Sequence, residues 1–360
     1  MTLSDISSLR IQNQEIQHQR FSVAKHLVAH MGAMQAQDFL MARWAVGLRL
    51  RGYDDATIVE AYNKGEIIRT HLMRPTWHFV SCDDVYWLLE LTAPQIKTLC
   101  KSRDRQLELD ESIYSRSNAM LEKALCGGVN LNRDELTRLY QDANIRTNEN
   151  RLSHLLMRAE LEGIICNGTI KQNKLTYALL RERVPVRKLL SREESLAELA
   201  MRYFTSHAPA TLRDFIWWSG LSVSEAKKAV EMIKSDFVYN TIDGTAYLFR
   251  NDQPDISQHN SLYLLPAFDE LLIGYTNRTA TITSTHHPIA ISNNGLFRPI
   301  IVENGQVTGV WKRTTQKTKA VIELTLFSIA SGTIMTELEH EIQKQALFLG
   351  KEVELVFAKE

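Results

Sequence analysis

The sequence has little that marks a secreted, membrane-bound or zinc-stabilised protein. Its four cysteines lie far apart and never form a Cys-x-x-Cys pair, so neither a structural zinc site nor a disulfide framework is expected. The N-terminus lacks the basic and apolar regions of a signal peptide. No apolar run approaches the roughly 20 residues of a membrane span. We therefore expect a cytoplasmic protein that does not bind a membrane.

Several enzyme signatures are also absent. The chain contains no Gly-x-x-x-x-Gly-Lys, His-Glu-x-x-His, Gly-x-Ser-x-Gly or Gly-x-Gly-x-x-Gly motif. The nearest approach to a metal cluster is His286-His287, which we place on a strand or at its end. Neighbours on a strand face opposite ways, so the two imidazoles are not expected to share a metal ion. We predict neither a metal nor a cofactor.

The chain has no excess of charge of either sign. Lysine plus arginine and aspartate plus glutamate both number 42, so the formal net charge of the 360 residues is zero. Any surface that binds nucleic acid must then be a local patch. Hydrophobic residues make up 44% of the chain and charged residues 23%, as in an ordinary globular protein. The length is sufficient for roughly two to four domains.

The first part of the chain has the order helix, helix, β-hairpin. Apolar residues recur at helical spacing on both sides of residues 30–38. Asp54-Asp55 can then cap a short helix that Gly65 ends. The runs 67–73 and 76–80 are rich in β-forming residues. This order is typical of a winged helix.

The same order recurs twice. In residues 131–179 two helices with apolar stripes precede a pair of strand-like runs. In the third copy Thr211 and Asp214 can cap a helix that Gly220 ends, a second helix follows, and Asp243-Gly244 turns a hairpin. We therefore predict three winged helices in tandem.

The last hundred residues change character. Strand-like runs with turns at Asn294-Gly295 and Asn304-Gly305 are followed by a helix near 334–349 and a strand near 353–357. We predict an α+β protein in which a barrel-like β domain follows the three winged helices. The predicted domains are residues 1–95, 96–185, 186–255 and 256–360, with linkers near 95–120 and 182–192.

The densest set of neutral polar groups lies in residues 30–38, His-Met-Gly-Ala-Met-Gln-Ala-Gln-Asp. Helical periodicity is interrupted here, so Gln35 and Gln37 should lie on a connector between two helices or in the first turn of the second. In extended or turning backbone, residues two apart point the same way, so both amides could reach one pocket. The spacing also fits a solvated loop with two polar side chains. Asp38 is expected to cap the following helix.

Three motifs make the chain similar to the AlkZ-like DNA glycosylases. Residues 34–38, Met-Gln-Ala-Gln-Asp, resemble the family's Gln-hydrophobic-Gln loop. Residues 69–80 resemble its Arg-Gly-Thr-Leu-His wing, with Pro75 where Gly is usual and Trp77 where Leu is usual. Residues 264–275, together with Asn-Gly, Arg-Pro and Gly-Val-Trp-Lys-Arg further on, resemble its C-terminal signature. The motifs occur in the family's order and cover most of the chain.

The resemblance implies a monofunctional glycosylase that hydrolyses the N-glycosidic bond of alkylated purines, of the N7-alkylguanine or crosslink type, in duplex DNA. Such a base is cationic and needs little protonation to leave, so the enzyme must stabilise an oxocarbenium-like sugar and hold a water. Gln35 and Gln37 would position that water, because an uncharged amide is too weak a base to deprotonate it. The loop contains no lysine, so no Schiff-base lyase step is expected.

The expected partner is double-stranded, damaged DNA, bound by a monomer associated with the nucleoid. The family's DNA-contacting hairpin would correspond by position to residues 304–313. The residues expected to contact DNA or line the pocket are Arg43, Arg69, Arg74, His78, Arg298, Trp311, Lys312 and Arg313. Further basic residues of the same stretches are Arg49, Arg51, Lys317 and Lys319.

Two other classes of function stay open. A non-catalytic winged-helix regulator would usually dimerise on a palindromic DNA site. A protein–protein scaffold would show no salt-dependent DNA binding at all. A monomer that prefers damaged DNA and has no sequence preference would count against the regulator.

Overall fold

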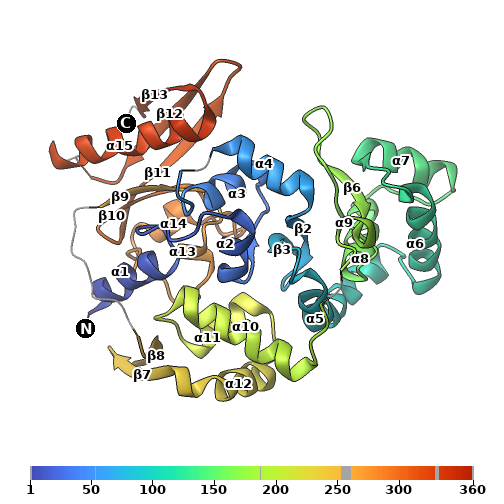
Figure 1. Cartoon of the computed structure of the whole chain (residues 1–360), viewed down its shortest axis with the longest axis horizontal. Helices are drawn as coiled ribbons and strands as arrows, with labels where there is room; N and C mark the ends of the chain where they lie inside the picture. The colour runs from blue at the N-terminus through green and yellow to red at the C-terminus, as the bar shows by residue number, and fades with distance from the viewer. Residues whose placement is uncertain (1, 53, 187, 253–260, 329–331, 359–360) are drawn as a thin grey trace.

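Residues 24–81 lie in the middle of the molecule between later parts of the chain, while the N-terminus lies at its edge (Figure 1). The computed structural model describes residues 2–52, 54–186, 188–252, 261–328 and 332–358. Figure 1 shows the second helical unit (green) at one side, the third (yellow) along the bottom and the C-terminal β domain (orange and red) above. This position brings the glutamine loop, residues 34–38, into contact with Glu270 of the C-terminal domain.

The N-terminal unit surrounds a three-stranded sheet of order β1-β3-β2. Its elements are α1 (Leu3–Asn13), α2 (Ala24–Met31), β1 (Met34–Gln35), α3 (Phe39–Gly47), α4 (Asp55–Lys64), β2 (Ile67–Leu72) and β3 (Thr76–Ser81). The predicted start and end of α4 are confirmed, because Asp54 accepts from the Thr57 N–H and Gly65 is the C-cap with φ of 79°. The predicted strands 67–73 and 76–80 are the β2–β3 hairpin.

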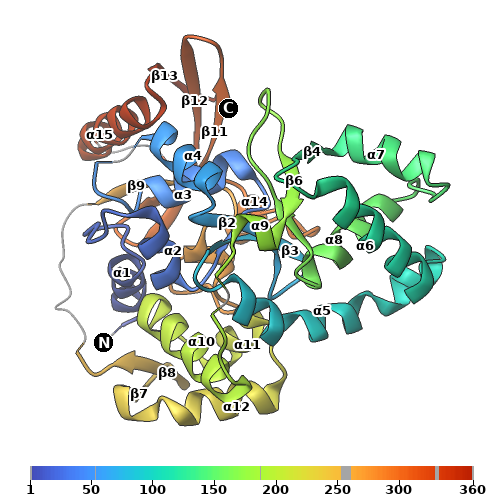
Figure 2. The same cartoon turned by 45° about the vertical axis from the view of Figure 1, so that its right-hand side comes forward.

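The second unit begins with two long helices where we expected a linker. Its elements are α5 (Val85–Gln106), α6 (Glu111–Leu125), β4 (Leu131–Asn132), α7 (Arg133–Asp142), α8 (Arg151–Leu161), β5 (Ile165–Asn167), β6 (Thr176–Leu179) and α9 (Leu180–Arg183). The predicted linker at 95–120 is therefore wrong. Pro94 and the polar run after it suggest a helix break, but Leu91, Ile96 and Leu121 are buried and hold both helices in place. Figure 2 shows α5 and α6 beside α8.

The third unit shows the predicted helix signals. Its elements are α10 (Arg192–His207), α11 (Leu212–Ser219), α12 (Val223–Met232), the 3-10 helix η1 (Lys234–Asp236), β7 (Phe237–Ile242) and β8 (Thr245–Arg250). Thr211 and Asp214 form a capping box at the start of α11, and Gly220 ends the helix with φ of 70°, as predicted. The predicted hairpin through Asp243-Gly244 is β7–β8.

The C-terminal domain is a curled, open sheet, a half-barrel, with strand order β13-β12-β11-β10-β9. Its elements are β9 (Leu262–Leu265), α13 (Glu270–Ile273), α14 (His287–Ala290), β10 (Ile300–Glu303), β11 (Gln306–Thr315), β12 (Lys319–Leu326), α15 (Gly332–Leu349) and β13 (Glu352–Phe357). The mixed α+β class is as predicted. The strand expected at His286-His287 is wrong: His287 begins α14, where Pro288 supplies a helical φ.

The hydrophobic cores extend across units that are distant in sequence. Leu72 and Leu88 share one core with Tyr203 and Phe215. Trp44 of α3 belongs to another core, packs edge-on against Phe348 with ring centroids 5.0 Å apart, and donates from Nε1 to the Leu264 carbonyl at 2.7 Å. The position of the N-terminal unit is thus fixed by burial against both the third unit and the C-terminal domain.

A buried ion pair adds to this junction. Nη1 and Nη2 of Arg49 donate to the two carboxylate oxygens of Asp269 at 2.9 and 2.8 Å, and both side chains are almost fully buried. Asp269 also caps α13 by accepting from the Leu271 N–H. Arg49 is therefore structural, and its grouping with the basic residues that face DNA is wrong.

Replacing Arg49 should weaken the whole fold. Arg49→Met leaves the Asp269 carboxylate buried without its cation, so we expect the free energy of unfolding to fall by about 3–5 kcal/mol. Urea denaturation followed by circular dichroism measures this change. The neighbouring Arg51 is exposed, and Arg51→Met should change stability by no more than about 0.5 kcal/mol. Equal stability of the two variants would contradict the assigned role of the ion pair.

Candidate active site

The two glutamines lie on the predicted connector but in different surroundings. Gln35 belongs to the short strand β1, opposite His78 of β3, and its side chain is buried. Gln37 is exposed in the turn that leads into α3. Asp38 caps that helix by accepting from the N–H groups of Leu40 and Met41, as predicted. Gln35 thus faces the protein interior, while Gln37 faces solvent.

Arg74 fixes the Gln35 carboxamide. Its Nη2 donates to Gln35 Oε1 at 3.1 Å, and its guanidinium lies 5.3 Å from the ring centroid of Trp217 on α11. A guanidinium has no acceptor, so this contact assigns the carbonyl end of the amide to Arg74 and leaves Nε2 as a donor. Burial lowers the pKa of Arg74, and the negative charge of Glu270 partly restores it.

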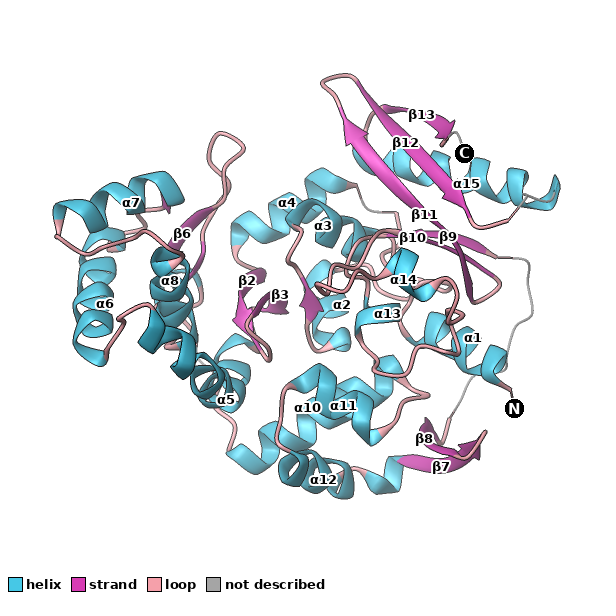
Figure 3. Cartoon of the chain, turned by 180° about the vertical axis from the view of Figure 1, so that it is seen from behind, coloured by secondary structure: helices cyan, strands magenta, loops and turns pink. Residues whose placement is uncertain are grey.

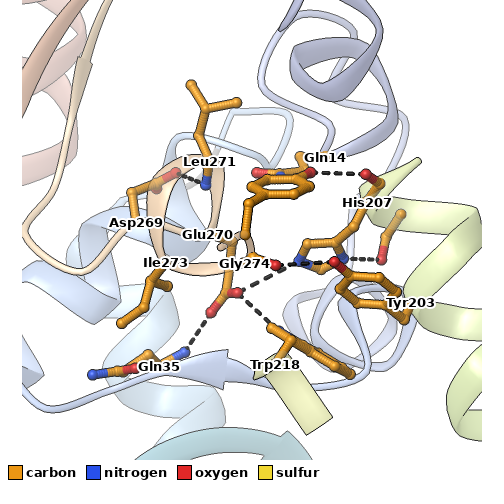
Figure 4. Close-up of polar contacts among 12 residues, drawn as sticks. Gln14, Gln35, Tyr203, His207, Trp218, Asp269, Glu270, Leu271, Ile273 and Gly274 are labelled. Atoms are coloured by element: carbon orange, nitrogen blue, oxygen red, sulfur yellow. Dashed lines mark hydrogen bonds and ion pairs between the residues drawn. The ribbon is translucent and has the colours of Figure 1, made fainter. Parts of the chain in front are cut away.

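Glu270 holds the backbone of the same residue. Its Oε1 accepts from the Gln35 N–H at 2.8 Å, while Oε2 accepts from Trp218 Nε1 at 3.0 Å and lies 3.4 Å from His207 Nε2 (Figure 4). Burial alone would raise the pKa of Glu270. The hydrogen bond and charge of His207, the Gln35 N–H and the charge of Arg74 outweigh burial and lower it. Glu270 is therefore ionised at neutral pH.

Glu270 was not among the residues predicted to form the site. The only signal was the pair Asp269-Glu270 inside an otherwise apolar run, Leu264-Leu-Pro-Ala-Phe before it and Leu-Leu-Ile after it. A charged residue in such a run is buried only when it is paired, so adjacent carboxylates there indicate two long-range partners.

Arg69 contacts the backbone carbonyls that follow Gln35 in the loop. Its Nε donates to the Ala36 carbonyl at 2.9 Å, Nη2 lies 3.5 Å from the Gln37 carbonyl, and Nη1 donates to Asn167 Oδ1 at 2.5 Å. Asn167 in turn donates to Glu160, whose carboxylate also contacts His71. This buried network ties the glutamine loop to the second unit.

The β2–β3 hairpin beside Gln35 carries unused hydrogen-bonding groups. Buried side-chain atoms without a partner among the described residues are Thr70 Oγ1, Arg74 Nε, Thr76 Oγ1, Trp77 Nε1 and His78 Nε2. His78 Nδ1 donates to the Thr76 carbonyl at 3.0 Å, so His78 Nε2 is an acceptor. Because buried polar groups are normally paired, this cluster is suited to bind water or a polar substrate group.

The residues predicted to contact DNA divide into buried and accessible sets. Arg69, His78 and Trp311 are buried, and Trp311 donates from Nε1 to the Leu265 carbonyl. The accessible residues border a pocket of about 380 Å³ between α3 and the β11–β12 strands. Arg298 and Lys312 are exposed there, and Arg313 is half-buried. Arg43 and Arg74 are half-buried too, and Arg43 pairs with Asp55 at 3.3 Å.

The hairpin that projects from the C-terminal domain is not centred on the expected segment. The turn at Asn304-Gly305 packs on α1, where Ser7 Oγ donates to the Gly305 carbonyl at 2.5 Å. The β11–β12 hairpin extends outward instead (Figure 3), with exposed Lys312 and Lys317. Of the expected segment 304–313, residues 309–313 pair with β12 and therefore lie on the projecting hairpin.

Metal and membrane features are absent from the described ranges. No three or more His, Cys, Asp or Glu side chains gather there as a metal ion would require. No helix in the same ranges combines the length and apolar character needed to cross a membrane. The groups that surround Gln35 are carboxylate, imidazole, indole and guanidinium groups.

Comparison with known proteins gives consistent matches. The sequence pattern of the AlkZ-like family, described as DNA glycosylase AlkZ-like, matches residues 28–348. An interstrand DNA cross-link repair glycosylase of Streptomyces sahachiroi is 24% identical over 326 residues, which cover 86% of this chain and 87% of the relative. The structure of the Streptomyces sahachiroi DNA glycosylase AlkZ superposes with a TM-score of 0.83 at 20% identity, covering 99% of this chain and 100% of that one. The folds are therefore alike over nearly their whole length.

The buried histidine beside Gln35 should make stability depend on pH. Burial and the charge of Arg74 lower the pKa of His78 from 6.5 to about 3. Below pH 6.5 the unfolded chain takes up a proton at this residue that the folded chain does not, so stability is lost as the pH falls.

His78→Asn keeps a donor for the Thr76 carbonyl but does not titrate. Between pH 6 and pH 4 the variant should lose about 1.4 kcal/mol less stability per pH unit than the wild type. Urea unfolding at several pH values measures both slopes. Burial also lowers the pKa values of His30 and His207, so the stability of both proteins still depends on pH through these two residues. Parallel pH profiles would contradict this assignment.

Proposed function

Because the chain belongs to the AlkZ-like DNA glycosylase family, we propose that it releases alkylated purines from duplex DNA by hydrolysing their N-glycosidic bond. The substrates are of the N7-alkylguanine or crosslink type. The name of the curated relative, which refers to interstrand cross-link repair, supports the second type. The observation that carries the proposal is that Gln35 is held at two points beside unpaired buried polar groups. Arg74 binds its side-chain oxygen, and Glu270 binds its backbone N–H.

The chemistry follows from this arrangement. An N7-alkylated purine is already cationic, so the leaving group needs no strong general acid, and no step through a Schiff base is required. The site must position a water and stabilise positive charge that develops on the sugar. For the water, Gln35 provides a donor at Nε2, and the neighbouring His78 provides an acceptor at Nε2. Gln37 supplies a second amide from the exposed side of the loop.

The remaining parts of the fold bind DNA. The three helix–helix–hairpin units act as winged helices that place the damaged duplex against the glutamine loop. The exposed cations Arg298 and Lys312 contact phosphates, together with the half-buried Arg43, Arg74 and Arg313 at the same surface. Arg69, His78 and Trp311 support the site from inside. The protein acts as a cytoplasmic, nucleoid-associated monomer.

Base release from a duplex with a single N7-methylguanine tests the proposal. We expect release by the wild type and a rate at least ~100-fold lower in Gln35→Ala/Gln37→Ala, equivalent to ~2.7 kcal/mol of transition-state stabilisation. The control is Gln95→Ala, an exposed glutamine on α5, which should keep the wild-type rate. The released base is quantified by chromatography under single-turnover conditions.

Two results would contradict the proposal in different ways. An unchanged rate in the double variant would show that Gln35 and Gln37 do not contribute to base release. No release from methylated or crosslinked duplexes, combined with tight binding to undamaged DNA, would favour a non-catalytic DNA-binding regulator instead.

A further inference from the structure

A groove of about 870 Å³ lies between α11, β8 and the loop that joins α13 to α14; we call it the α11 groove. Its lining includes Arg213, Arg278 and His287, and most of its other polar side chains are hydroxyls, such as those of Thr245 and Thr279. No carboxylate is among the described residues that line it. The α11 groove therefore has a surplus of positive charge in a protein whose net charge is zero.

Neither arginine forms an ion pair among the described residues, although the negative charge of Asp214 acts on Arg278 from a greater distance. Arg278 is held in place, because its Nε donates to the Leu272 carbonyl at 2.7 Å and its guanidinium lies 5.1 Å from the Phe297 ring centroid. Burial lowers the pKa of Arg278 to about 10, which leaves it charged at neutral pH.

Asp214 on α11 offsets part of the charge of Arg278, but its carboxylate is bonded inside the protein and does not line the groove. Its side chain is buried, where Oδ1 accepts from the N–H and hydroxyl of Thr276 at 2.8 and 2.7 Å and Oδ2 accepts from Thr211. These bonds orient the loop after α13, and both carboxylate oxygens already accept hydrogen bonds within the protein. The cations that face the groove are thus available to an outside anion.

A row of residue contacts links the α11 groove to the glutamine loop. Arg213, Ile216 and Trp217 share the accessible face of α11 at helical spacing. The next contacts are Trp217 with Arg74 and Arg74 with Gln35. Figure 3 shows α11 and α13 between the β2–β3 and β7–β8 hairpins, consistent with this path.

We propose that the α11 groove binds the phosphodiester backbone of the DNA strand that flanks the lesion. Arginine, threonine, serine and asparagine side chains are the usual contacts of DNA phosphates, and they make up most of the polar lining. The inference rests on the proposed function, since it assumes that the damaged base lies at Gln35. It assigns to the third unit a contact outside the lesion site.

The test measures how affinity depends on the length of the flank. Lesion-containing duplexes are extended stepwise on one side or the other, and Kd is determined by fluorescence anisotropy over a range of salt concentrations. For the wild type, affinity should rise once one of the two flanks reaches the groove. Arg213→Glu should lose at least about fivefold in affinity for that long duplex, and its salt slope should fall by about 1–2.

Arg105→Glu is the matched control, because Arg105 is exposed on α5 and the charge change is identical. It should bind every duplex as the wild type does. Equal affinity and salt slope for Arg213→Glu and Arg105→Glu on all duplexes would overturn the assignment of the groove.

The base-release assay separates this inference from the proposed function. If Arg213→Glu binds the flank more weakly but the wild type releases no base, DNA binding by the α11 groove would be supported and the glycosylase reaction rejected. If the wild type releases the base and Arg213→Glu binds duplexes of every flank length with wild-type affinity, the reaction would be supported and DNA binding by the α11 groove rejected.

Discussion

The buried carboxylate of Glu270 joins three parts of the chain at one point. It belongs to α13 of the C-terminal domain, accepts from the backbone of Gln35 in the N-terminal unit, and accepts from Trp218 of the third unit. A buried anion is stable only with such partners, because removing it from water costs several kcal/mol. The position of the glutamine loop is therefore coupled to the packing of the whole protein.

The same principle recurs around the loop. Asp269, next to Glu270, binds Arg49, which follows α3. Arg69 binds the loop carbonyls and contacts the second unit through Asn167. Each of these bonds links residues far apart in sequence. Together they hold the backbone on both sides of Gln35 and Gln37, as a site that positions a water requires.

Local features of the fold could be predicted from the sequence. The caps at Asp38, Asp54 and Thr211 and the β2–β3 and β7–β8 hairpins depend on neighbouring residues, so composition and spacing sufficed. The α5–α6 segment was mistaken for a linker because Pro94 and a polar run conceal an apolar stripe that only tertiary packing reveals.

The partners of charged residues could not be predicted in this way. Arg43, Arg49, Arg69 and Arg298 look alike in sequence, yet Arg49 and Arg69 are buried within internal networks and Arg298 is exposed. The difference lies in contacts with residues more than thirty positions away, such as Asp269 and Ala36. Glu270 was missed for the same reason, since none of its partners is a sequence neighbour.

The most direct test of this account is the single-turnover rate of base release by Glu270→Gln at saturating DNA, measured together with Kd. The substituted amide can accept from the Gln35 N–H but presents a donor to Trp218 or His207, so the loop should shift while the DNA surface stays intact. We predict a rate at least ~10-fold lower, a Kd within about threefold of the wild type, and a cooperative thermal transition. A folded variant with the wild-type rate would contradict the claim that Glu270 positions the glutamine loop.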